Sequence, residues 1–489
     1  MMAIVPRVLA YILGVAGLSF LLPIAAAFLY GERAVVPAFA VPMAASWIVG
    51  FVFWLRSRTS IRTIGVEHAF IVVGAAWIAI SVFGAIPLYA SGACPRLVDA
   101  VFESVSGFST TGASVLADVE SLPRSINLWR CETHWLGGMG VIALAVALMP
   151  LLGAGGFRLI KAETSGPEKG KLTARVTNTA KVLWAIYCGM TLVLALALHV
   201  AGLSWHDAVC HAFSTVGSGG FSTRNASVGA FGNPSVEWIC TAFMLLTSVN
   251  FALYYHLMQG HIRDVWRNSE LRAFLSIVAV AVALVAVFQF RAFGSVAETL
   301  RTAAFQVAAV VSTTGFGKDD YLAWLPQSQI VLLALFFIGG CSGSTAGGVK
   351  VIRWTVLGKQ LVNEFHRLLH PHGVYTIRIN GTPGREEVVP VVGSFIFCYV
   401  ILVFLTSLVG AMGGLDLVSA FTGALSMVGN IGPAFGSLGP FDTYGALPGF
   451  VKAWYCVAML AGRLEIYTLV ILVGRSVQNL TPPVRPWFR

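Results

Sequence analysis

The chain contains 489 residues, of which 57% are hydrophobic and 11% are charged, and its formal net charge is +10. Soluble globular proteins contain about 25% charged residues, so this composition excludes a soluble enzyme or binding module and indicates a protein embedded in lipid.

Ten apolar stretches are long enough to cross a bilayer, which requires about 17–25 residues. The first follows Arg7 as a secretory signal would, but apolar residues continue after Pro23, so we expect this helix to be retained. The predicted spans lie near Val8–Tyr30, Val35–Leu55, His68–Tyr89, Leu128–Leu152, Lys181–Gly202, Ser235–Leu257, Leu271–Phe290, Val388–Gly410, Gly449–Val473 and, with an interruption, Gln327–Leu357.

An even number of spans predicts that both termini lie on one side of the membrane. Most Lys and Arg residues fall at the termini or in loops after even-numbered spans, which the positive-inside rule places in the cytoplasm. Topology in a bacterial inner (plasma) membrane therefore explains the net charge, and no nucleic-acid partner is needed. Acidic residues of the opposite face would concentrate cations at a pore mouth or would simply be solvated: Asp99, Asp118, Glu120, Asp207, Asp319, Asp320, Asp416 and Asp442.

After a leading helix pair (residues 1–64), the chain repeats one pattern four times: an apolar helix, a short apolar segment, a glycine-containing turn and a second helix. We place these repeats at residues 65–157, 158–262, 263–386 and 387–489, with a broken second helix in the third. The first two repeats align without gaps over Asp99–Ser114 and Asp207–Ser222, whereas the fourth fits mainly in length. The predicted fold is an all-α polytopic membrane protein with four pseudo-symmetric helix–pore-loop–helix repeats around one ion pore.

The short segment before each turn has about ten to thirteen residues and would reach roughly 15–20 Å as a helix, which is half a bilayer. Its C-terminal end would direct negative partial charge at the pore centre and favour a cation there. The turns are STTGAS (Ser109–Ser114), GSGGFS (Gly217–Ser222), STTGFG (Ser312–Gly317) and GNIGPAFG (Gly429–Gly436).

Four turns of this kind can close a ring of carbonyl oxygens that replaces the water around a monovalent cation. A single glycine of this kind would more simply be a small packing residue in a membrane helix. Four in equivalent places favour a selectivity filter for potassium, which we assign to Thr110, Thr111, Gly112, Ser218, Gly219, Gly220, Thr313, Thr314, Gly315, Asn430, Ile431 and Gly432.

The interrupted span contains GGCSGSTAGG (Gly339–Gly348), whose glycines each disfavour a helix by about 1 kcal/mol relative to alanine. It is either a flexible gate loop below the filter or a kinked helix packed closely on a neighbour, and we favour the gate. Arg463, in the last span, would either face the cavity below the filter or be satisfied by carbonyls or the gate loop, and we favour the cavity. Glu465 is expected to be solvated or at an interface. The predicted gate residues are Gly339, Gly340, Gly343, Ser344, Thr345, Gly347, Gly348, Lys350 and Arg463.

The four turns, WLGGMG (Trp135–Gly140), GGCSGSTAGGVK (Gly339–Lys350) and GRLEIYT (Gly462–Thr468) resemble the pore subunits of Trk-type potassium uptake systems in the Trk/Ktr/HKT superfamily, over nearly the whole chain. The resemblance implies four repeats around one axis, a homodimer, a gate and a cytosolic ring of nucleotide-binding regulatory subunits. Glycine at all four filter positions is associated there with potassium preference. The fourth turn departs from the Thr-Thr-Gly type, which predicts asymmetric coordination.

No nucleotide-binding motif occurs in this chain, so potassium is the only ligand that we expect. The basic cytoplasmic face suits an acidic partner or anionic membrane lipids. His366, His370 and His372 lack the partners of a metal site. Cys94 and Cys131 fall on the outer side of one repeat, but their spacing does not demand a disulfide.

Three transport functions fit a chain of this kind, which we do not expect to be an enzyme. The first is a gated potassium uptake pore, and the second is a cation-coupled (proton or sodium) potassium symporter. Coupled carriers usually show two corresponding broken helices, whereas this chain has four re-entrant turns and one glycine-rich break, which favours the pore. The third, a transport ATPase, needs a phosphorylation or nucleotide motif, which is absent here, so this chain could only be an ion-binding subunit of one.

Overall fold

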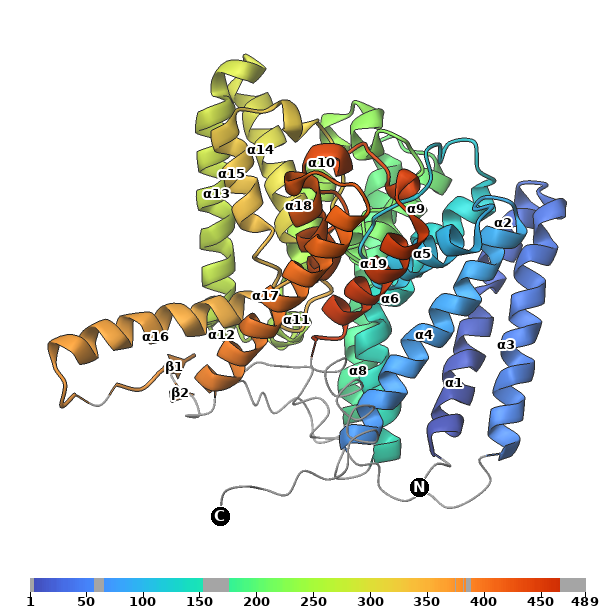
Figure 1. The fold of residues 1–489 in the computed structure, drawn as a ribbon, viewed down its shortest axis with the longest axis horizontal. Coiled ribbons are helices and arrows are strands. Elements are labelled where there is room, and N and C mark those ends of the chain that lie inside the picture. Colours follow the sequence, from blue (N-terminus) through green and yellow to red (C-terminus); the bar gives the residue numbers. More distant parts are fainter. Residues whose placement is uncertain are drawn as a thin grey trace.

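The computed structural model describes residues 4–56, 66–152, 176–373, 375–380, 382–383 and 388–466. These residues form mostly helices, and the described part contains one small sheet (Figure 1). Both termini and most of the basic loop predicted at 158–181 lie outside the described residues, so the predicted orientation of the termini stays a prediction.

Long helices surround a centre of shorter ones. The first span consists of α1 (Ile4–Ser19) and its short continuation α2 (Leu21–Leu29). The other long helices are α3 (Val36–Arg56), α4 (Val66–Ala90), α6 (Arg124–Leu152), α8 (Val176–Val200), α13 (Ser269–Phe293) and α17 (Val388–Met412). By length and composition, six stretches of the described chain can cross a membrane, and α10 (Pro234–Thr247) with α11 (Phe251–Met258) would make a seventh. A membrane protein with several helical spans is therefore confirmed.

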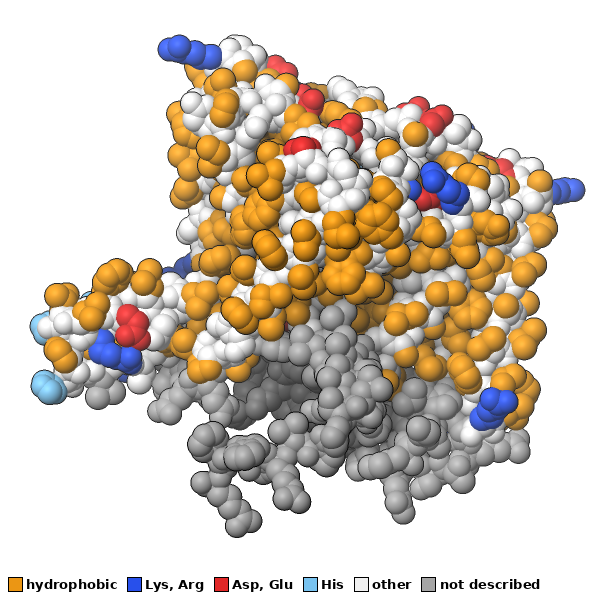
Figure 2. Space-filling view, in the orientation of Figure 1, with side chains coloured by type: hydrophobic (Ala, Val, Ile, Leu, Met, Phe, Trp, Pro, Cys, Tyr) orange, Lys and Arg blue, Asp and Glu red, His pale blue; other side chains and the backbone are white. Residues whose placement is uncertain are grey.

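The outer surface of these helices is apolar. Leu29 on α2, Val287 on α13 and Phe404 on α17 are each more than two thirds exposed. Figure 2 shows apolar side chains over the flank, with acidic side chains gathered towards one end. Exposed apolar surface of this extent fits contact with lipid tails rather than water.

Four short helices lie inside this shell, each between two longer elements. They are α5 (Leu97–Phe108), α9 (Trp205–Val216), α14 (Val296–Val311) and α18 (Leu417–Gly429). Each is followed by one of the predicted turns and then by α6, α10 (Pro234–Thr247), α15 (Pro326–Leu335) or α19 (Gly449–Arg463). The segment α14 has 16 residues, longer than expected, because the Ser295 side chain caps it further upstream.

The predicted span Ser235–Leu257 is bent and is not one straight helix. It is divided into α10 and α11 (Phe251–Met258), which are bent by 92° relative to each other. The bend exposes backbone groups that the glycine-rich segment satisfies: Cys341 N donates to Ser248 O (2.8 Å) and Phe251 N donates to Gly343 O (3.1 Å). Contacts between distant residues therefore stabilise the bend.

The glycine-rich span is broken, as expected. The helix α15 ends at Leu335, and α16 (Val351–Leu369) leaves the body sideways (Figure 1). The remaining elements are α12 (Ile262–Arg267), the antiparallel pair β1 (Arg378–Ile379) and β2 (Thr382–Pro383), and short 3-10 turns at Arg33–Val35, Ser227–Phe231, Tyr321–Ala323, Gly436–Leu438 and Tyr444–Ala446.

Candidate functional site

The four predicted turns share one backbone conformation. The first residue of each triplet is left-handed, with φ of 55° at Thr110, Ser218 and Thr313 and 53° at Asn430. Each glycine is left-handed as well, with φ between 71° and 100° at Gly112, Gly220, Gly315 and Gly432. Non-glycine residues rarely adopt positive φ, so its recurrence in four distant segments indicates a common structural requirement.

The structure brings the four turns together in a closed ring. A Cβ atom added to Gly112 would lie 2.0 Å from Gly219 O, and one on Gly220 would lie 1.9 Å from Thr314 O. The series continues from Gly315 to Ile431 O (2.0 Å) and returns from Gly432 to Thr111 O (2.6 Å). Each glycine therefore lies directly against a carbonyl of the next turn, and any side chain there would force the ring apart.

The short helices hold the turns through their last carbonyl groups. The middle residue of three turns donates from its backbone N to the carbonyl five residues earlier: Thr111 to Ser106 (2.9 Å), Gly219 to Ser214 (2.8 Å) and Ile431 to Ser426 (3.0 Å). In the third turn Gly315 N donates instead to Ala309 O (2.9 Å). The turns therefore satisfy carbonyls that a helix end leaves open.

The second turn has glycine where the others carry Thr111, Thr314 and Ile431 because a histidine from α6 occupies that space. A Cβ on Gly219 would lie 2.2 Å from the His134 ring. His134 also stacks on Phe221 at 4.1 Å between centroids, and Phe221 N donates to its Nδ1 (3.3 Å). Sequence reasoning missed His134, since a single histidine in an apolar helix gives no signal of this contact.

The fourth turn, which differs most in sequence, is tied to the first by a side chain. Asn430 Nδ2 donates to Thr111 Oγ1 and to Met459 O, both at 2.9 Å. Asparagine tolerates the left-handed conformation better than most residues. Hydroxyl groups support the segment that follows the glycine: Tyr444 donates to Gly432 O (2.8 Å) and Tyr321 to Ala434 O (2.6 Å).

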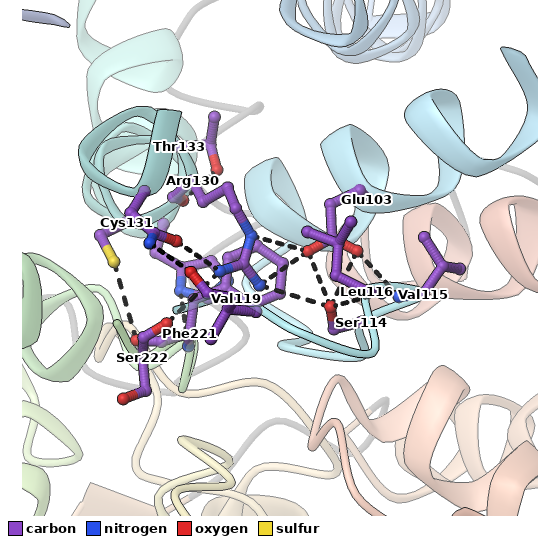
Figure 3. A network of polar contacts seen from close by, with 12 residues as sticks. Glu103, Ser114, Val115, Leu116, Val119, Arg130, Cys131, Thr133, Phe221 and Ser222 are labelled. Atoms are coloured by element: carbon purple, nitrogen blue, oxygen red, sulfur yellow. Dashed lines mark hydrogen bonds and ion pairs between the residues drawn. The ribbon is translucent and has the colours of Figure 1, made fainter. Parts of the chain in front are cut away.

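A buried ion pair lies behind the first turn (Figure 3). Arg130 Nη2 of α6 lies 2.8 Å from Glu103 Oε1 of α5, and their side chains are 2% and 0% exposed. Glu103 also accepts hydrogen bonds from Ser114 Oγ, at the end of the turn, and from Val115 N directly after it. Sequence reasoning missed this pair as well, because 27 positions separate the two residues in the chain.

Glycines in two of the sequence motifs, Trp135–Gly140 and Gly462–Thr468, allow the helix after a turn to approach the short helix before it closely. A Cβ on Gly137 would lie 1.9 Å from Phe108 O at the end of α5, and one on Gly462 would lie 2.1 Å from Val428 O in α18. In both cases the helix after the turn can pack directly on the short helix before it.

The glycine-rich loop touches the third and fourth turns. Gly347 N donates to Thr313 Oγ1 (2.6 Å), and a Cβ on Gly347 would lie 2.7 Å from Gly429 O. A hydrogen bond from Gly339 N to Val349 O (2.9 Å) joins the two ends of the loop. Its other side is held by Glu270, which accepts Ser342 N at 2.7 Å.

Arg463 is buried and bridges the loop to α6. Its guanidinium donates to Thr345 O (2.7 Å) and to Gly137 O (2.9 Å). These are the contacts expected if carbonyls and the gate loop satisfy the arginine. Lys350 donates from Nζ to Ala346 O. Glu465, which we expected to be solvated or at an interface, is partly exposed and forms an ion pair with Arg353.

Several predicted outer acidic residues have structural partners. Asp99 lies 2.6 Å from Lys452 Nζ, and Asp207 lies 3.0 Å from Arg224 Nη2. Asp416 caps α18 by accepting from Val418 N and Ser419 N. These carboxylates therefore fix loops and helix ends.

Cys94 and Cys131 are buried free thiols. Within the described residues, no group of three or more His, Cys, Asp or Glu residues is arranged to hold a metal ion.

Comparisons with known proteins relate the whole chain to one family. The TrkH family, described as "Cation transport protein", matches residues 36–478. The Trk system potassium uptake protein TrkH of Halomonas elongata is 37% identical over 471 residues, covering 95% of this chain and 97% of that protein. The Trk system potassium uptake protein TrkG of Escherichia coli K12 is 34% identical, covering 96% and 97%. The crystal structure of the potassium transporter TrkH from Vibrio parahaemolyticus gives a TM-score of 0.86 at 32% identity, covering 98% of this chain and 100% of that chain.

The contact with His134 predicts that Gly219→Ala destabilises the protein. The added methyl group would overlap the imidazole ring, and overpacking of this kind typically lowers stability by about 1–3 kcal/mol. We expect a lower thermal midpoint in detergent. Gly189→Ala in α8 is the matched control because a Cβ there meets no atom within 4 Å. Equal midpoints for the two variants would contradict the packing described here.

Proposed function

Because the chain belongs to the TrkH family of cation transport proteins, we propose that it carries potassium into the cell through a pore at the centre of its four turns. Its relatives are named as potassium uptake proteins, and it is a multi-pass membrane protein. The observation that supports this pathway best is the closed ring in which each turn's glycine lies against a carbonyl of the next.

In this proposal the twelve residues Thr110–Gly112, Ser218–Gly220, Thr313–Gly315 and Asn430–Gly432 form the selectivity filter. Their backbone carbonyls replace the hydration shell of a monovalent cation, which is the ligand chemistry that potassium prefers. The four short helices all end at the ring, so their negative C-terminal ends favour a cation there. Potassium is the cargo, and the chain needs no other cofactor.

The loop Gly339–Lys350 is the proposed gate. It rests against the third and fourth turns through Gly347 and is linked to α6 through Arg463. Opening would break the hydrogen bond from Gly347 N to Thr313 Oγ1 and the one from Arg463 to Thr345 O. The first is a neutral hydrogen bond and the second is charge-assisted. Each contributes about 0.5–3 kcal/mol, and binding of a regulatory partner can supply that energy.

The assembly that we propose follows the family. Two copies of the chain form a homodimer in the inner membrane with both termini in the cytoplasm. A cytosolic ring of nucleotide-binding regulatory subunits controls the gate, and anionic lipids contact the basic cytoplasmic face. The boundaries 1–64, 65–157, 158–262, 263–386 and 387–489 remain our proposed leading pair and repeats.

Flux measurements in liposomes test this function. Purified protein should pass potassium or rubidium in response to voltage, without any need for a proton or sodium gradient. Uptake that requires a proton or sodium gradient would instead favour the cation-coupled symporter. Absence of potassium flux in both conditions would overturn the transport proposal for this chain.

The ring predicts that Gly112→Ser and Gly315→Ser weaken discrimination against sodium. A side chain at either position would displace the neighbouring carbonyl and alter the ring that the ion enters. We expect the potassium-to-sodium flux ratio to fall on the order of tenfold, equivalent to about 1.4 kcal/mol. Gly189→Ser is the control and should keep the ratio. Unchanged ratios in both ring variants would refute the filter assignment.

The contacts of the loop predict that deleting Gly343–Gly347 raises basal potassium flux several-fold. The deletion removes the donor to Thr313 Oγ1 and the acceptor of Arg463. Flux is measured in liposomes without regulatory subunits, beside the thermal midpoint of the same preparation. A folded deletion variant that stays silent would show that the break is structural.

A further inference from the structure

The buried pair Glu103 and Arg130 contacts the segments that follow the glycines of two turns, the first and the second. Glu103 accepts from Ser114 Oγ (2.9 Å) and Val115 N (2.9 Å), two and three residues after Gly112. Arg130 pairs with Glu103 and also donates from Nη1 to Ser222 O (3.3 Å), two residues after Gly220. Ser114 and Ser222 are equivalent positions in the gap-free alignment of the first two repeats.

The guanidinium of Arg130 is itself fixed on several sides (Figure 3). Besides Glu103 and Ser222, Nη1 donates to Asn127 Oδ1 (3.1 Å) and Nη2 donates to Ser114 Oγ (3.3 Å). Its central carbon lies 4.3 Å from the centroid of Phe221, which stands directly after Gly220. A planar guanidinium with this many fixed partners has little freedom to move.

The position of Glu103 carries no carboxylate in the second repeat. The residue there is His211, whose Nε2 contacts Ser222 Oγ at 2.9 Å. Other ion pairs lie after the second and third turns, where Arg224 pairs with Asp207 and Lys318 pairs with Glu237. The Glu103–Arg130 pair differs from these in that its contacts reach the segments after two turns, the first and the second.

We infer that Glu103 and Arg130 are a positioning pair that holds the first and second turns at fixed spacing and so sets the preference for potassium over sodium. The inference rests on the proposed filter. Breaking a buried ion pair strands an unpaired charge, so the pair resists the displacement that a smaller ion would induce.

Selectivity measurements on the full-length protein in liposomes test the inference. The variants are Glu103→Gln, Arg130→Lys and the double variant Glu103→Gln/Arg130→Gln. Lysine at 130 keeps the charge beside Glu103 but cannot reach Ser222 O and Asn127 together. We expect the potassium-to-sodium flux ratio to fall about tenfold in each, while potassium flux persists. The double variant should regain thermal stability, because neither charge is stranded, without regaining selectivity.

The matched control is Glu32→Gln. Glu32 also accepts hydrogen bonds from α6, at Arg124 N (2.7 Å) and Ser125 N (3.0 Å), but no contact described for it reaches a turn. It should keep the wild-type flux ratio. A loss of selectivity in Glu32→Gln equal to that in the pair variants would overturn the inference, because any weakening of α6 would then suffice.

Folded pair variants with a wild-type flux ratio would also overturn it and leave the pair a role in stability alone. If Glu103→Gln fails to fold, the potassium-to-sodium flux ratio of Arg130→Lys, which retains the ion pair, tests the inference instead. Failure of the filter itself is distinguishable. If Gly112→Ser and Gly315→Ser also leave the ratio unchanged, the filter assignment is wrong. If the ring variants reduce the ratio and the pair variants do not, only the positioning pair is refuted.

Discussion

The structure depends on one constraint: non-helical backbone in the apolar interior must find hydrogen-bond partners within the protein. Four turns of such backbone meet at the centre, and each is satisfied by its surroundings. The short helices accept the turn amides, tyrosine hydroxyls and a histidine ring support the segments after the glycines, and Asn430 ties the last turn to the first. Glycine stands where the turns touch because no side chain fits there.

Buried charged side chains also find partners within the protein. Asp99 with Lys452, Glu103 with Arg130, and Glu237 with Arg301 are paired, and Arg463 donates to two carbonyls. The Glu103–Arg130 pair contacts the segments after the first and second turns, and Lys318, after the third turn, pairs with Glu237. The third and fourth turns also contact the glycine-rich loop. This contact gives the proposed gate a direct route to half of the proposed filter.

Periodic and repeated features could be predicted from the sequence. The apolar runs predicted a helical membrane protein, and the recurring short segment with its glycine turn predicted which residues meet at the centre. The bend of 92° between α10 and α11, the contact of His134 with Gly219, and the pairing of Glu465 with Arg353 could not be predicted. Each depends on a contact between residues far apart in sequence, for which composition and spacing hold no signal.

The central claim is that a dehydrated potassium ion is held by carbonyl oxygens from all four turns. It is tested most directly by a crystal structure with bound thallium, which substitutes for potassium and scatters anomalously. The account predicts anomalous peaks on the axis of the ring, within coordination distance of carbonyls from Thr111, Gly219, Thr314 and Ile431. Thallium bound elsewhere in the protein, with no peak inside the ring, would contradict it.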